Sequence, residues 1–279
     1  MNIYGEKLYM RDLLKEIKKH LRVHRMFTKI SLMQQLEYRA NFIIGISAEC
    51  MWLATKLVYA FIVHQTGSTV GGLSPDEITL FIGTFILLTS IYTGLFMMNF
   101  FYIPWRVQGG ELDLMIVKPI STQFHLTMRE VDFAIPIPNI IGGLITLGIS
   151  WSRLGLEAGL RNIIVYVCLI ISGTVLTYSI FLVPCLITFW TVKVQALTEI
   201  AGRMWDFNNM PMHIYGKWMQ RVGTFVIPVF VIANFPVMAL FDSLPPLYLA
   251  WGLIIPFVVF TIVKKIFDHA IKRYSSAGG

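Results

Sequence analysis

The sequence predicts an all-α membrane protein, and three observations carry this prediction. The chain has 279 residues, of which 56% are hydrophobic and only 14% charged, and its mean hydropathy is +0.65, whereas about a quarter of the residues in a soluble domain are charged. Apolar runs of about 20 residues, the length that crosses a bilayer, recur along the chain. The basic residues behind the net charge of +7 crowd both ends, which indicates membrane orientation rather than nucleic-acid binding.

Five apolar runs are expected to span the membrane. They cover residues 42–63, 78–101, 133–150, 162–190 and 247–267. Basic residues before the first run and after the last predict that both termini are cytoplasmic, which requires an even number of crossings. The loops 64–77 and 151–161 then face outward, and the loop 102–132 faces the cytoplasm.

The stretch 191–246 admits two topologies. In the first topology, 191–221 stays in the cytoplasm and 222–241 forms the fifth span. The basic residues Lys217 and Arg221 favour this arrangement, since positive charge is retained on the cytoplasmic side.

The second topology places a polar fifth span at 194–211 and lets 212–241 dip into the membrane from the outer side. Pro228 and Pro236 interrupt the apolar run within that second segment. They favour this arrangement, because broken backbone at membrane depth is tolerated only where protein or a wet cavity covers it.

Residues 1–40 are expected to form a cytoplasmic segment with an amphipathic helix. Leu14, Ile17 and Leu21 share one side, and lysines and arginines occupy the others. This pattern is typical of a helix that lies at the lipid surface, attracted to anionic headgroups; the alternative is an ordinary amphipathic helix that packs on protein. The last residues, 269–279, are expected to form a cytoplasmic tail.

No motif for nucleotide binding, metal binding or nucleophilic catalysis is present. The one Gly-Lys pair, Gly216-Lys217, is followed by Trp218 rather than by the Ser or Thr of a phosphate-binding loop. The three cysteines lie in apolar runs without paired spacing, which is typical of small hydrophobic residues. We therefore expect no catalytic residue, no metal and no bound cofactor in this chain.

The most informative stretch is "RVQGGELDLMIVKPIST", residues 106–122. Gly109 and Gly110 end the preceding helix and permit a tight turn. The segment that follows predicts a helix of about eight residues, with two acidic residues in its first turn and Lys118 in its last, as the helix dipole favours. Pro119 prevents the helix from continuing.

The apolar face of this short helix predicts a contact. Leu112, Met115 and Ile116 have i, i+3, i+4 spacing and so share one face. Such a short helix is unstable alone in water, so this face must dock on something; the loop either contacts another protein or packs on its own chain. Ser121 is expected to cap the helix that returns to the bilayer.

Charged residues at membrane depth need a reason, because each costs at least about 2.5 kcal/mol at mid-bilayer. Glu49 and Lys56 lie two turns apart on the first span, and Glu199 and Arg203 have the i, i+4 spacing of an ion pair. Together with Asp206 they are candidates for a substrate path or a subunit interface. The alternative, favoured for Lys56 and Asp206, is that they only pack or extend to the membrane surface.

Three segments of the sequence resemble a known family. They are "LEYRANF" before the first span, "WRVQGGELDLMIVKPIST" between the second and third, and "NMPMHIYGKWMQRVGTFVIPVFVIANFPVMAL" before the last. Together they resemble the ABC-2-type permease family, the membrane subunits of type V ABC exporters with about six spans. The loop carries the more specific part of this resemblance.

The resemblance implies six transmembrane helices, with 194–211 as the fifth span and 212–241 as re-entrant helices before the sixth, within a transmembrane domain of residues 41–268. It also implies that the loop is a coupling helix that docks on a separate ABC ATPase subunit, present in two copies, which binds the ATP and Mg. The contact residues would be Glu111, Leu112, Asp113, Met115 and Lys118, with Gly109, Gly110 and Pro119 setting the geometry.

The same resemblance implies a second permease chain, identical or related, and a location in a cell membrane, the bacterial inner or plasma membrane. Membrane lipids are partners, and nucleic acid is not. The alternative function is a membrane-embedded enzyme or a stand-alone secondary transporter.

Overall fold

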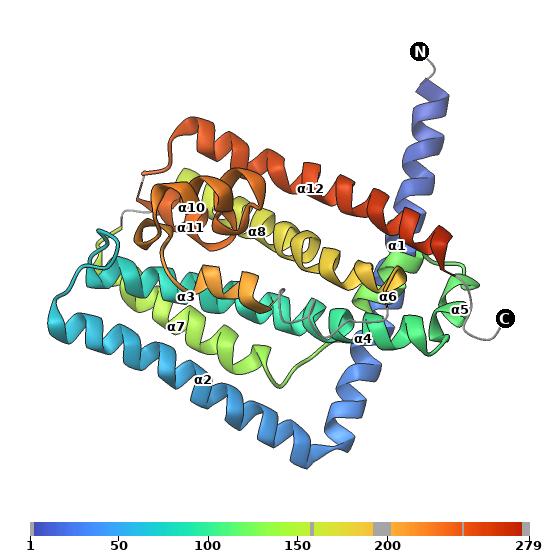
Figure 1. Ribbon diagram of the computed structural model, residues 1–279, viewed down its shortest axis with the longest axis horizontal. Helices are drawn as coiled ribbons and strands as arrows, with labels where there is room; N and C mark the ends of the chain where they lie inside the picture. Colours follow the sequence, from blue (N-terminus) through green and yellow to red (C-terminus); the bar gives the residue numbers. More distant parts are fainter. Residues whose placement is uncertain (1–2, 157–158, 192–201, 242, 275–279) are drawn as a thin grey trace.

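The computed structural model describes residues 3–156, 159–191, 202–241 and 243–274, and the long elements within these ranges are all helices (Figure 1). In chain order they are α1 (Ile3–Glu37), α2 (Arg39–Thr66), α3 (Pro75–Tyr92), the π-helical turn η1 (Thr93–Met97), α4 (Met98–Gln108), α5 (Glu111–Ile116), α6 (Thr122–Met128), α7 (Pro136–Arg153), α8 (Leu160–Leu186), the 3₁₀ turns η2 (Ile187–Phe189), η3 (Phe207–Asn209) and η4 (Met212–Ile214), α10 (Lys217–Arg221), the π-helical turn η5 (Val222–Val226), α11 (Val229–Leu240) and α12 (Pro246–Arg273).

Four helices in the described ranges are long and apolar enough to cross a membrane. They are Arg39–Thr66, Pro75–Gln108, Leu160–Phe189 and Pro246–Arg273, and they contain nearly all of the expected first, second, fourth and last spans. The second is one continuous rod, because α3 passes through η1 into α4 without a break.

The expected count of six spans is not reached in the described part of the chain. The run expected at 133–150 does form a helix, α7, with 18 residues, but it is not among the helices apolar enough to qualify. Its prolines, its asparagine and its terminal arginine dilute its aliphatic residues. Of the expected fifth span at 194–211, residues 194–201 lie outside the described residues; 202–206 are helical and lead into η3.

A bent pair of helices occupies the stretch with two possible topologies. Lys217–Val226 and Val229–Leu240 meet at an angle of 100°, and Pro228 lies at the break. With this pair counted as one span, the described residues contain up to five spans. The geometry is that of a broken span or of a re-entrant loop.

The buried apolar core is formed mainly by α3, α4, α8, α11 and α12, and glycines permit the close approach of helices, including that of α7 to α3. A Cβ on Gly173 of α8 would lie 2.7 Å from the carbonyl oxygen of Ile232 on α11, and one on Gly83 of α3 would lie 3.0 Å from the amide nitrogen of Leu147 on α7. Small residues at helix contacts are the usual device for tight packing in membranes, where there is little hydrophobic drive between helices.

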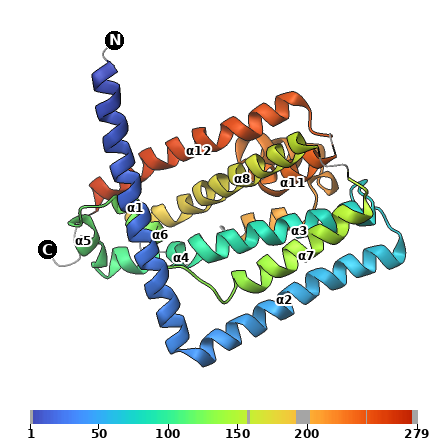
Figure 2. The same ribbon diagram turned by 180° about the vertical axis from the view of Figure 1, so that it is seen from behind.

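The helix α1 crosses the bundle at the end that carries α5 and α6 (Figure 2). Its apolar side chains stay largely uncovered: Leu14, Ile17 and Leu21 are 49%, 46% and 63% exposed. A helix that packed on protein through this face would bury it. The exposed face supports the lipid-surface position, which remains a proposal.

Candidate functional site

The loop between α4 and α6 has the punctuation that the sequence predicts. Gly110 adopts φ +76°, the left-handed conformation that glycine accepts at least cost, directly before α5. Glu111 and Asp113 lie in the first turn of α5. The amide nitrogen of Phe124 donates to the hydroxyl of Ser121 at 3.4 Å, so the expected cap of α6 is confirmed.

The inner face of α5 differs from the expectation. Leu112 and Met115 are 0% and 2% exposed and belong to this chain's own core, together with Leu126 of α6. The prediction that these two side chains face a partner is therefore corrected, because α4 and α6 cover the apolar face first. The helix has six residues rather than about eight, and Lys118 lies beyond its end instead of in its last turn.

The outer face of the loop carries apolar residues that the sequence analysis did not select. Leu114 and Val117 are 69% and 79% exposed, and Trp105, one turn before the glycines, is 68% exposed. Ile116 is 40% exposed. The sequence did indicate this second apolar face, since Leu114 and Val117 have i, i+3 spacing. The segment is apolar on both faces, however, and only the neighbouring helices decide which face is buried.

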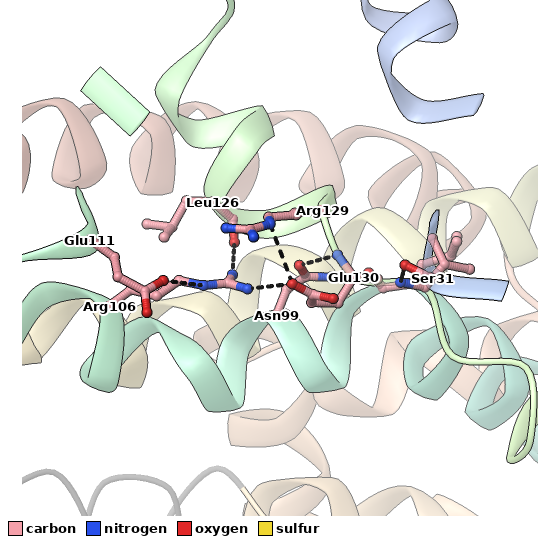
Figure 3. Close-up of polar contacts among 9 residues, drawn as sticks. Ser31, Asn99, Arg106, Glu111, Leu126, Arg129 and Glu130 are labelled. Atoms are coloured by element: carbon pink, nitrogen blue, oxygen red, sulfur yellow. Dashed lines mark hydrogen bonds and ion pairs between the residues drawn. The ribbon is translucent and has the colours of Figure 1, made fainter. Parts of the chain in front are cut away.

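A buried arginine holds this loop against the bundle (Figure 3). Arg106 is 5% exposed, and its Nη2 donates to Oε1 of Glu130 at 2.6 Å. Its Nη1 donates to the carbonyl oxygen of Leu126 at 3.4 Å, and its Nε lies 4.0 Å from a carboxylate oxygen of Glu111. The guanidinium also lies over the ring of Tyr102. One side chain on α4 therefore joins the start of α5, the end of α6 and the segment after it.

Asn99 strengthens this junction through the backbone of Glu130. Its Nδ2 donates to the carbonyl oxygen of Glu130 at 2.7 Å, and its Oδ1 accepts from the amide nitrogen of the same residue at 2.8 Å. In the π-helical turn just before it, the carbonyl oxygen of Gly94 accepts from the amide nitrogen of Asp132 at 2.9 Å. The chain entering the third expected span is thus fixed to the second span by its own backbone.

The helix α1 contacts the same junction from the other side. The ring of His20 accepts from the amide nitrogen of Ser121 at 3.4 Å. The hydroxyl of Ser31 accepts from the amide nitrogen of Val131 at 3.2 Å. Gln35 donates to the carbonyl oxygen of Val131 at 2.8 Å. The N-terminal helix is therefore tied to both ends of the segment 121–131.

His125 of α6 lies at the centre of this contact. Its ring stacks on Phe27 of α1 with centroids 5.4 Å apart, and it is 2% exposed. Burial and then the charges of Lys118, Arg129 and Arg106 lower its pKa to about 4. At neutral pH the ring is therefore uncharged.

The charged residues of the first span are paired with amides rather than with each other. Glu49 accepts from Nδ2 of Asn139 on α7 at 2.6 Å. Lys56 donates to Oδ1 of Asn209 at 2.9 Å, and Nδ2 of that asparagine donates to Asp206 at 3.2 Å. Lys56 and Asp206 are thus joined through one amide that the sequence analysis did not select.

The other expected pair cannot be followed. Glu199 lies outside the described residues, and Arg203 is exposed beside an open pocket next to Trp205. In the part of the chain that is described, no group of three or more His, Cys, Asp or Glu side chains could hold a metal ion.

Residues 50–278 match the family described as ABC-2 family transporter protein. This match covers most of the chain. The chain belongs to the ABC-2 transporter family. No curated protein and no solved structure matches it. As an ABC-2 transporter protein it is a multi-pass membrane component of a transport system, with no catalytic domain of its own.

Proposed function

We propose that this ABC-2 protein is the permease subunit of an ATP-driven exporter, and that the loop from Trp105 to Pro119 is where a separate ABC ATPase binds. The observation that supports this proposal is a loop with two opposed apolar faces, one buried in the bundle and one exposed. Exposed apolar side chains grouped on a cytoplasmic loop are typical of a protein contact. Two copies of the ATPase would bind the ATP and Mg, since this chain has no nucleotide motif.

In this proposal the outer face makes the contact and the inner face transmits the motion. Leu114 and Val117 supply apolar area to the ATPase, and the exposed Glu111 and Lys118 supply charges at its rim. Leu112 and Met115 do not touch the ATPase but insert between α4 and α6. A push on α5 therefore displaces both helices.

The buried ion pair makes this transmission stiff. Arg106 bonds to Glu130 and to the carbonyl oxygen of Leu126, and its Nε lies 4.0 Å from Glu111 of α5, so a tilt of α5 is passed to the ends of both flanking segments. The motion then reaches the second expected span through α4 and the third through the segment 130–135. Energy from ATP hydrolysis on the partner would be expressed as a rearrangement of these spans.

The substrate path is proposed to lie where this chain meets a second permease chain, identical or related. The first span supports this, since only 11% of its most apolar stretch is buried by its own chain. Glu49, Lys56, Glu199, Arg203 and Asp206 remain proposed residues of that path or interface. Both termini are proposed to be cytoplasmic. Membership of the ABC-2 family favours this function over a membrane enzyme or a secondary transporter.

A co-purification experiment tests the proposal. The full chain is expressed with an ABC ATPase encoded beside it, and retention of the ATPase and its stimulated ATP hydrolysis are measured. The double change Leu114→Asp and Val117→Asp should abolish both, because it places two charges in the apolar contact. The matched control, Leu247→Asp, changes an exposed leucine at the opposite end of the bundle and should retain both.

Two outcomes would contradict the proposal. The first is full retention of the ATPase by the double variant while its own unfolding temperature is unchanged. The second is a chain that purifies without any ATPase and transports on an ion gradient.

A further inference from the structure

A cavity lies between α6, α8 and α12, and it has no part in the proposed contact with the ATPase. This cavity has a volume of about 340 Å³, near the lower end of the range for small-molecule sites, roughly 300–1,000 Å³. Its apolar lining includes Phe96, Val175 and Phe260, and its polar lining includes Tyr178 and Lys264. It is large enough for part of a ligand whose remainder stays outside.

Three of the polar groups that line the cavity are already hydrogen-bonded to one another. Nε2 of Gln123 donates to the hydroxyl of Tyr178 at 2.9 Å, and the hydroxyls of Tyr178 and Thr127 lie 3.1 Å apart. These three groups satisfy one another. Lys264 is exposed and, within the described residues, forms no ion pair. The ammonium group is therefore the part of the cavity that is free to bind a charge.

The order of charged and apolar residues along the cavity matches that of a bilayer leaflet, from headgroup to hydrocarbon. Lys264 is the first charged residue after the apolar run 247–263 of α12, and it precedes the basic end of that helix. Phe260 lies one turn earlier on α12, so its backbone is about 6 Å from that of Lys264 along the helix axis. A ligand here meets a cation at the headgroup level and mostly apolar side chains deeper in the membrane. Thr174 also lines the cavity, but its hydroxyl already donates to the carbonyl oxygen of Ile170.

The charges around the cavity favour an anion. No carboxylate is among the described side chains that line it. The neighbouring cavity of about 320 Å³, on the other side of Phe124 and Met128, includes Glu16 in its lining and offers no such preference. Lys272 and Arg273 at the end of the same helix add positive charge on that side.

We propose that this cavity binds an anionic glycerophospholipid of the cytoplasmic leaflet. The phosphate lies beside Lys264, and one acyl chain runs along Phe260 and Val175 toward Phe96. The lipid thereby fills the gap between α12 and the α6 helix that follows the coupling loop. This inference concerns a lipid site and stands whether or not an ATPase binds the loop.

Lipid retention by the purified full-length chain tests the proposal. Phosphatidylglycerol and phosphatidylcholine are offered in mixed nanodiscs, and the lipid that stays with the chain after detergent extraction is counted by native mass spectrometry. The wild-type chain should retain phosphatidylglycerol preferentially. Lys264→Gln should lower that retention about fivefold, the effect of one lysine beside an anionic headgroup, whereas Lys265→Gln, the neighbouring lysine outside the cavity, should leave it unchanged.

Two further experiments test whether the molecule bound in the cavity is a lipid. Excess inorganic phosphate should not displace the lipid, because it cannot use the apolar walls. Val175→Trp fills the apolar part and should lower retention of phosphatidylglycerol even with Lys264 intact. If Val175→Trp does not fold, the comparison of the two lysine variants still decides.

Three results would overturn the proposal: equal retention by the Lys264 and Lys265 variants, equal retention of the two lipids by the wild-type chain, or displacement by inorganic phosphate alone. A density or cross-link showing that a protein segment fills the cavity in the native complex would also overturn it.

Discussion

The first two candidate membrane helices both have the hydropathy of a span, yet one lies at the edge of the molecule and the other in its interior. In the rod Pro75–Gln108, 72% of the most apolar stretch is buried by the rest of the chain, against 11% in Arg39–Thr66. Figure 1 shows α3, the first part of this rod, between other helices, and α2 at the edge of the bundle. Hydropathy reports transfer out of water, not which neighbour replaces the water.

The residue types explain the difference. The buried rod uses small and hydroxyl residues: Gly83 admits α7, and Thr84 bonds both to the carbonyl oxygen of Leu80 and to the hydroxyl of Tyr166 at 3.0 Å. The edge helix exposes large aliphatic and aromatic side chains such as Phe61, which is 61% exposed. Glu49 and Lys56 lie on its less exposed side, where they fasten α2 to the bundle.

The buried ion pair at the end of the rod should show the largest effect of a single substitution. Arg106→Leu leaves the Glu130 carboxylate without its closest partner and should lower the free energy of unfolding by about 3 kcal/mol. The control Arg129→Leu removes a cation that lies 3.5 Å from the same carboxylate but is 42% exposed, and it should cost less than 1 kcal/mol. Denaturation of both variants in detergent measures the difference. Equal stabilities would show that the rod does not depend on this pair.

The glycine contacts should come next. Gly173→Ala places a Cβ against backbone of α11 that cannot rotate away, so we expect a loss of about 2–3 kcal/mol. Gly148→Ala on α7 has open space around it and should be neutral or stabilising by about 0.5–1 kcal/mol. Thermal unfolding of the two variants compares a crowded helix face with an open one. A stable Gly173→Ala variant would contradict the close packing of α8 and α11.

Acid should weaken the junction of α1 and α6. Since the pKa of His125 is lowered from 6.5 to about 4, the unfolded chain takes up a proton below pH 6.5 that the folded chain resists until about pH 4. Stability is therefore complete above pH 6.5 and falls as the pH falls, by about 2 kcal/mol at pH 5. His125→Phe keeps the stacking on Phe27 and should flatten this dependence, whereas His213→Phe, at an exposed position, should not. Unfolding curves between pH 7 and 4.5 test this; parallel curves for the wild-type and His125→Phe chains would refute it.

The smallest effect is expected on the edge helix. Glu49→Ala removes the hydrogen bond to Asn139 and should cost about 1 kcal/mol, near the upper range for one interhelical bond in a membrane. Phe61→Ala, on the exposed face, should change the stability of the isolated chain by less than about 0.5 kcal/mol. If Phe61→Ala instead dissociates a purified oligomer, the uncovered face of α2 is a subunit contact; if Glu49→Ala has no effect on stability, the polar attachment is unimportant.

Local features of the fold were predictable because they depend on neighbours in sequence. The bounds of four crossing helices follow from runs of apolar residues, the turn at Gly110 from its glycines, and the start of α6 from Ser121. Proline at 228 indicated the break in the bent pair, although not its angle.

Features that depend on distant residues were not predictable. The segment 111–117 is apolar on two sides, and only the placement of α4 and α6 turns Leu112 and Met115 inward and leaves Leu114 and Val117 outside. Arg106 and Glu130 are 24 positions apart, and no spacing rule joins them.

The π-helical turn at Thr93–Met97 sets the phase of everything that follows it. Such a turn is an α-helix with one residue inserted, so the face presented below it is rotated by about 100° relative to the face above. Excising a single residue there would leave the rod straight and helical while aiming Asn99 and Arg106 away from the backbone and carboxylate they now hold. One extra residue therefore sets the rotation of α4 relative to α3. An insertion or deletion of one residue in this turn would disrupt the contacts of Asn99 and Arg106 more completely than most side-chain replacements.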